Sequence, residues 1–147
     1  AGGYGYAIKR DYYTLQGDPA DGPFAAGERR VVVLTIQPFE EVGARLIVDD
    51  ALPAGLEIDN PNLLRSGDIR ALDWLKLADT ETAQFRAERF VAAVDHRGDE
   101  AFQLAYVVRA ISPGDYHHPA ALVQNMYDPS RRGRTDAGRV TVIGPLQ

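Results

Sequence analysis

The sequence contains no cysteine and only three histidines among its 147 residues. Without cysteine the chain has no disulfide, no thiolate nucleophile and no thiolate ligand for a metal. No apolar run approaches the roughly 20 residues that a membrane-spanning helix needs. Acidic residues outnumber basic ones by 21 to 16, which gives a formal net charge of −5. This balance argues against a nucleic-acid partner, because a duplex-binding surface needs clustered lysine and arginine.

The few histidines also leave little material for catalysis, since hydrolytic sites need a nucleophile, a base and an orienting acid. His96 lies next to Asp95 near a turn, which is typical of a surface histidine. His117 and His118 are adjacent, so on a strand they point to opposite faces and cannot share one metal ion. No serine stands in a Gly-x-Ser-x-Gly setting. We therefore expect no enzymatic activity, no resident cofactor and no metal site.

Charged clusters give no stronger indication of a site. The acidic pairs at 40–41 and 49–50 provide oxygen ligands of the kind that Ca²⁺ prefers, but neither belongs to a recognisable calcium loop. We interpret both pairs as solvated strand ends. The dense basic run over 131–134 is interpreted as a solvated loop.

The apolar pattern predicts strands separated by turns. Residues 4–15 alternate with an aromatic face, and the β-branched run over 31–36 is typical of a central strand covered on both faces. Residues 112–115 are predicted to form a turn, because proline and glycine occupy favoured positions there. Turn signals recur every ~8–12 residues, which is typical of a Greek-key sandwich. The expected strands cover 4–15, 29–39, 44–49, 57–58, 85–95, 102–111, 120–127 and 139–143.

The segment over 60–77 does not alternate, and it is expected to form one short helix or a long ordered loop. No repeat, low-complexity tract or linker divides the chain. The predicted fold is therefore an all-β antiparallel sandwich of Greek-key type with at most one short helix. We expect residues 1–147 to form a single domain.

The most informative stretch runs from 105 to 129. There Met126 and Tyr127 come at the end of a predicted strand, directly before Asp128 and Pro129. A residue before proline is kept extended, so Asp128 cannot continue into a helix. Two large side chains are thus predicted where the backbone leaves the sheet. By itself, this pattern favours an ordinary strand end with its flanking turn.

Motifs along nearly the whole chain resemble a known family. The run Tyr-Val-Val-Arg-Ala-Ile-Ser-Pro-Gly-Asp-Tyr over 106–116 and the Leu-Pro-Ala-Gly segment over 52–55 are the most specific of them. Together with the other matching segments, they resemble the C-terminal, receptor-binding-type domain of bacterial α2-macroglobulins. The matching segments, in the same order as in the family, are 7–13, 52–61, 85–93, 106–116 and 123–127, with Pro119.

This resemblance implies a non-catalytic domain of a periplasmic protease trap, a protein built from macroglobulin-like sandwiches and a helical domain with a Cys–Gln thioester. It implies that Met126 and Tyr127 match a Met-Tyr pair that packs over the thioester and shields it from water. The implied partners are the thioester domain, the other macroglobulin domains of the same polypeptide and the target proteases of the full-length protein. No membrane contact is expected from this domain itself, and the secretion signal is expected upstream of this sequence.

A different class of function stays open at this point. A stand-alone adhesion or carbohydrate-binding sandwich would need a ligand face, and exposed tyrosines are suited to that role because they join an apolar ring to a hydroxyl. The candidates for such a face are Tyr4, Tyr6, Tyr12 and Tyr13.

Overall fold

The structure is a computed structural model that describes residues 2–20, 22–39, 44–58, 82–86, 89–96, 100–128 and 130–144. Within these ranges the chain forms thirteen strands, and no helix there is long and apolar enough to cross a membrane. In chain order the strands are β1 (Gly2–Tyr4), β2 (Tyr6–Tyr13), β3 (Phe24–Ala25), β4 (Arg29–Pro38), β5 (Ala44–Ala51), β6 (Leu56–Ile58), β7 (Thr82–Arg86), β8 (Arg89–His96), β9 (Phe102–Ala110), β10 (Gly114–His118), β11 (Ala121–Asn125), β12 (Arg132–Arg134) and β13 (Gly138–Ile143).

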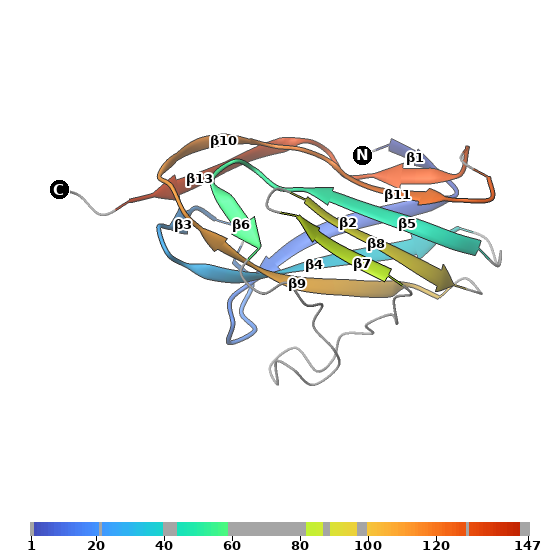
Figure 1. Cartoon of the computed structure of the whole chain (residues 1–147), viewed down its shortest axis with the longest axis horizontal. Helices are drawn as coiled ribbons and strands as arrows, with labels where there is room; N and C mark the ends of the chain where they lie inside the picture. The colour runs from blue at the N-terminus through green and yellow to red at the C-terminus, as the bar shows by residue number, and fades with distance from the viewer. Residues whose placement is uncertain are drawn as a thin grey trace.

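The strands form three sheets, and most of the strands run roughly along the long axis of the molecule (Figure 1). One sheet has the order β1-β12-β11-β5-β8-β7, the second has the order β2-β4-β9-β6, and a small third sheet has the order β10-β13-β3. Among the described residues, all strand pairings are antiparallel except that between β13 and β3. The turn from β11 to β12 lies at one end of the sandwich, and strand β13 ends at the other (Figure 1).

The core lies between the sheets, and strand β4 shows how the sequence determines it. Val32, Leu34 and Ile36 point into the main core, while Val31 and Val33 join a second buried cluster on the other face. A β-branched run suits such a strand, because both of its faces are covered and no position needs to be polar. Each fully buried side chain of this size stabilises the fold by about 1.5–3 kcal/mol.

The prediction of an all-β antiparallel sandwich is confirmed, and strands occur at each expected position, with some differences in extent. The expected strand over 85–95 is two strands, since β7 pairs with β8 as a hairpin. The predicted turn at 112–115 is wrong in its second half. There Gly114 and Asp115 already pair with Val142 and Thr141 of β13, so a neighbouring strand decides their conformation. The helix or loop expected over 60–77 lies outside the described residues.

Two interpretations of charged clusters are also corrected. The basic run over 131–134 was expected in a loop, but Arg132–Arg134 form strand β12, which pairs with both β1 and β11. The side chains of Arg132 and Arg134 are exposed, so the run is solvated although it is not a loop. Asp50, expected at a solvated strand end, is 1% exposed. The pair at 40–41 lies outside the described residues.

Candidate functional site

Met126 and Tyr127 follow directly after β11, in the turn that leads to β12. Their side chains are 45% and 76% exposed, which places them among a few large apolar residues of the described chain that face solvent. Phe39, at 59% exposed, follows the end of β4, whose last residue Pro38 pairs with Tyr6 near this turn. Large apolar side chains that are exposed to solvent and lie at the same end of a molecule are typical of a contact surface.

Asn125, the last residue of β11, organises the turn. Its side-chain carbonyl oxygen accepts the backbone N–H of Tyr127 at 2.8 Å and that of Asp128 at 3.1 Å. Its side-chain amide donates to the Tyr6 hydroxyl at 3.2 Å. The side chain is only 2% exposed. This arrangement is an Asx turn, in which a short polar side chain replaces a backbone partner and directs the chain out of the strand.

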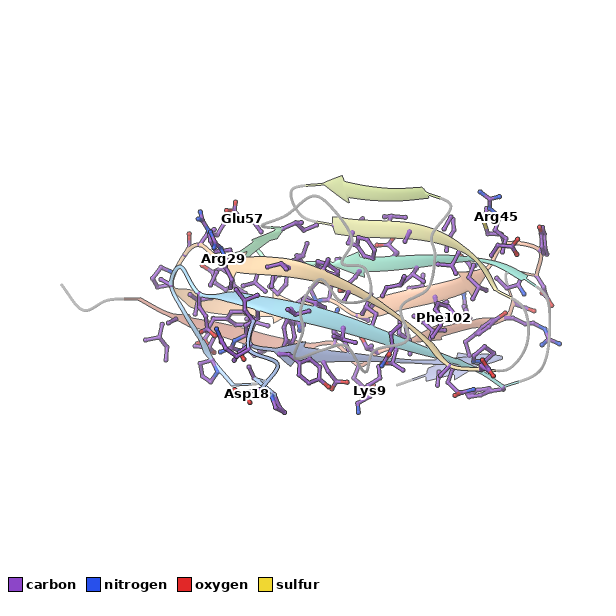
Figure 2. All side chains as sticks on the ribbon, turned by 90° about the horizontal axis from the view of Figure 1, so that it is seen from below. Lys9, Asp18, Arg29, Arg45, Glu57 and Phe102 are labelled. Atoms are coloured by element: carbon purple, nitrogen blue, oxygen red, sulfur yellow. The ribbon has the colours of Figure 1, made fainter. Side chains whose placement is uncertain are left out.

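Backbone hydrogen bonds hold the same turn to its neighbours. The Met126 N–H donates to the Arg45 carbonyl oxygen on β5 at 2.8 Å, and the Asn125 N–H donates to the Arg131 carbonyl oxygen at 3.0 Å. Arg45 lies at the same end of the sandwich as Phe102, away from Arg29 and Glu57 (Figure 2). The backbone of Met126 is therefore anchored to β5 while its side chain extends outward.

Asp128 closes the turn on its far side. Its carboxylate accepts the Ser130 hydroxyl at 2.6 Å and lies 3.5 Å from the Arg131 Nε. The hydrogen bond from the Ser130 hydroxyl is the main cause that lowers the pKa of the Asp128 carboxyl below its usual value. Asp128 therefore stays ionised in ordinary buffers, and its charge helps hold the exposed turn together.

The turn presents mainly an apolar surface. Residues 125–131 include no histidine or cysteine, and the Ser130 hydroxyl donates its hydrogen bond to the Asp128 carboxylate. In the described parts of the chain no group of three or more acidic, histidine or cysteine residues could hold a metal ion. What the turn provides is an apolar surface with a defined position, made of one broad ring and one adaptable thioether.

A second polar cluster lies in the interior, and it explains the burial of Asp50. The Asp50 carboxylate accepts hydrogen bonds from Arg10 and from the Tyr106 hydroxyl, and the Arg10 guanidinium also donates to the Pro119 carbonyl oxygen at 2.8 Å. Burial raises the pKa of Asp50, and the charge of Arg10 opposes that rise. Nearby, the His118 Nε2 lies 2.9 Å from the Tyr12 hydroxyl. Arg10, Asp50 and Tyr106 meet one another's hydrogen-bonding needs, so their cluster links β2, β5 and β9 inside the sandwich.

The structure does not place Tyr6, Tyr12 and Tyr13, suggested as part of an exposed ligand face, on one shared exposed face. Tyr6 is 4% exposed and belongs to the main core, and Tyr12 packs against that core. Tyr13 points to the other face of β2 and packs against the second buried cluster. The interpretation was wrong because the apolar face of a strand turns toward whichever sheet covers it. The side chain of Tyr4 lies outside the described residues.

Of the residues singled out in the sequence, the structure brings Met126 and Tyr127 together on one turn and places His117 and His118 on opposite faces. The sequence interpretation missed Asn125 as the organiser of the turn. Its signal was available, because an asparagine at a strand end with Asp-Pro three residues later is typical of a side chain that caps a turn.

Comparisons with known proteins support the family resemblance that the motifs along the chain indicate. The model of the bacterial α2-macroglobulin MG10 domain matches residues 5–130. A curated α2-macroglobulin of Xylella fastidiosa is 36% identical over 152 aligned residues, which cover 94% of this chain and 9% of that protein. The chain thus spans about a tenth of the length of the relatives that it matches.

Solved structures match over almost the entire chain. The native conformation of Escherichia coli α2-macroglobulin, determined by cryo-EM, has a TM-score of 0.81 and 30% identity, covering 97% of this chain and 10% of that one. Salmonella α2-macroglobulin reacted with methylamine has a TM-score of 0.80 and 32% identity, covering 96% of this chain and 9% of that one.

Proposed function

This chain belongs to the bacterial α2-macroglobulin family, and from that membership we propose that it is a non-catalytic domain that contacts and shields a thioester. The domain spans residues 1–147 and lies in the C-terminal region of a periplasmic protease trap. Met126 and Tyr127 are its contact residues. Its partners are the thioester domain and other macroglobulin domains of the same polypeptide, and target proteases meet it only through the full-length protein.

The observation that carries this proposal is the exposure of Met126 and Tyr127 on a turn with a hydrogen-bonded backbone. The bonds go to β5, to the Arg131 carbonyl oxygen and to the Asn125 side chain. Tyr127 is 76% exposed, yet its N–H is bonded to the buried Asn125 side chain. An unanchored turn would offer a mobile side chain and lose conformational entropy when a partner orders it. A held turn avoids most of that loss, so its side chains are ready for contact.

The chemistry of a thioester gives such a contact a use. A thioester is consumed by water or amines unless access to its carbonyl carbon is denied, and a dry apolar cover denies it. The tyrosine ring supplies area, and the methionine side chain adapts to an irregular gap. The present sequence has no cysteine, so the thioester must be supplied by another part of the parent protein. The role of this domain is therefore steric.

The test is Tyr127→Gly in the full-length parent protein, with methylamine incorporation as the readout. Removing the ring opens the cover, and the rate of incorporation is expected to rise at least about tenfold, which corresponds to about 1.4 kcal/mol of lost protection. Methylamine is a suitable probe because the Salmonella relative has been solved after reaction with it.

The matched control is Ile111→Gly, which removes another exposed apolar side chain, 42% exposed, just after β9 at the opposite end of the sandwich. This control is expected to leave the incorporation rate unchanged. Equal rates in the Tyr127→Gly variant and the unsubstituted protein would exclude the shielding role while leaving the family membership intact.

A further inference from the structure

We propose that Asn125 is the positioning residue of this site. Its side chain fixes how far the Met126–Tyr127 turn projects from the core, because it hydrogen-bonds the turn to the opposite sheet. This inference rests on the proposed shielding function and extends it to a residue that contributes no surface of its own. Asn125 is 2% exposed, so it does not itself contact a partner domain.

The hydrogen bonds of the Asn125 side chain divide into two sets. The carbonyl oxygen accepts two backbone N–H groups, those of Tyr127 and Asp128, and thereby turns the chain away from the strand direction. The amide group donates to the Tyr6 hydroxyl, and Tyr6 is itself 4% exposed. A buried amide with partners on both its oxygen and its nitrogen has little freedom to rotate, because rotation would leave buried polar atoms unsatisfied.

The hydrogen bond from Asn125 to Tyr6 matters because of where Tyr6 lies. Asn125 ends β11 of the six-stranded sheet, whereas Tyr6 begins β2 of the four-stranded sheet, where it pairs with Pro38 of β4. The bond between the two side chains therefore spans the sandwich and joins the turn to the opposite layer. Backbone bonds to Arg45 and Arg131 hold the turn only within its own sheet. The cross-sheet bond can thus set how far the turn rises from the core.

Three substitutions separate these contributions. Asn125→Leu keeps the side-chain bulk and removes all three of the hydrogen bonds described for the side chain. Asn125→Asp keeps an acceptor for both backbone N–H groups, and the Tyr6 hydroxyl can then donate to it. Tyr6→Phe leaves the Asx turn in place and removes only the tie to the opposite sheet, so it remains informative if Asn125→Leu fails to fold.

The experiment uses the full-length parent protein and two readouts, hydrogen exchange at the Tyr127 and Asp128 amides and the rate of methylamine incorporation. In Asn125→Leu both are expected to rise about fivefold or more, because each of the two amides loses its acceptor and the hydrogen bond to Tyr6 is lost as well. Asn125→Asp is expected to restore both to near the unsubstituted values. Tyr6→Phe is expected to raise methylamine incorporation with little change in exchange.

A control for general destabilisation is Val142→Ala, a buried truncation in β13, which should lower stability without changing either readout. If Tyr127→Gly speeds incorporation but Asn125→Leu and Tyr6→Phe do not, the positioning role is refuted and the shielding role stands. If Tyr127→Gly has no effect, the shielding role itself fails. Unchanged amide exchange in a folded Asn125→Leu variant would also refute the positioning role.

Discussion

Acidification is expected to destabilise this chain through one buried histidine, His118, and replacement by glutamine should abolish that effect. The ring of His118 is 9% exposed, and its Nε2 lies 2.9 Å from the Tyr12 hydroxyl. Burial, together with smaller contributions from the charges of Arg10 and His117, lowers the pKa of His118 from 6.5 to about 3. The folded chain therefore keeps this histidine neutral across the mildly acidic range.

The sign of the effect follows from proton binding. Below its unfolded-state pKa of 6.5 the histidine binds a proton in the unfolded chain, but the folded chain does not bind it until the pH approaches about 3. The contribution of His118 to stability is thus complete above pH 6.5 and is lost as the pH falls. Between about pH 7 and about pH 4.5 the loss amounts to about 2.5 kcal/mol of unfolding free energy.

Urea unfolding followed by circular dichroism at these two pH values measures the effect. The difference in unfolding free energy should be smaller by about 2.5 kcal/mol in His118→Gln than in the unsubstituted chain. The matched control is His117→Gln, because His117 is the exposed neighbour on the same strand and makes the smallest contribution to the lowered pKa of His118. Most of the difference should therefore remain in this variant. Equal pH dependence in His118→Gln and the unsubstituted chain would refute the account of a buried, neutral imidazole.

Two further substitutions test the interior by the same unfolding measurement. Arg10→Met leaves the Asp50 carboxylate buried without its cation and is expected to cost about 3–5 kcal/mol, so unchanged stability would contradict a buried ion pair. Gly133→Ala places a Cβ 2.5 Å from the Tyr6 carbonyl oxygen and is expected to cost about 1–3 kcal/mol, whereas Gly138→Ala, with open space around it, should be neutral. Equal stability of the two glycine variants would exclude that close approach.

Contacts between residues far apart in the chain could not be predicted, and these contacts decide the site. Asn125 and Tyr6 are separated by 119 positions, and Arg10 and Asp50 by 40. No local pattern in the sequence indicates such partners, since each depends on the order and register of strands from different sheets. The prediction that Asp50 is solvated failed for this reason, because only the assembled sandwich brings Arg10 and Tyr106 to its carboxylate.

The sequence by itself indicated where the long strands lie and how their faces alternate, because side-chain direction along a strand has a period of two residues. It also placed Met126 and Tyr127 where a strand ends before proline, and it predicted that His117 and His118 point opposite ways. Only the tertiary structure decided which of the two histidines is buried and that the tyrosine face of β2 turns inward. The physical reason is that alternation defines two faces, whereas burial depends on which face another sheet covers.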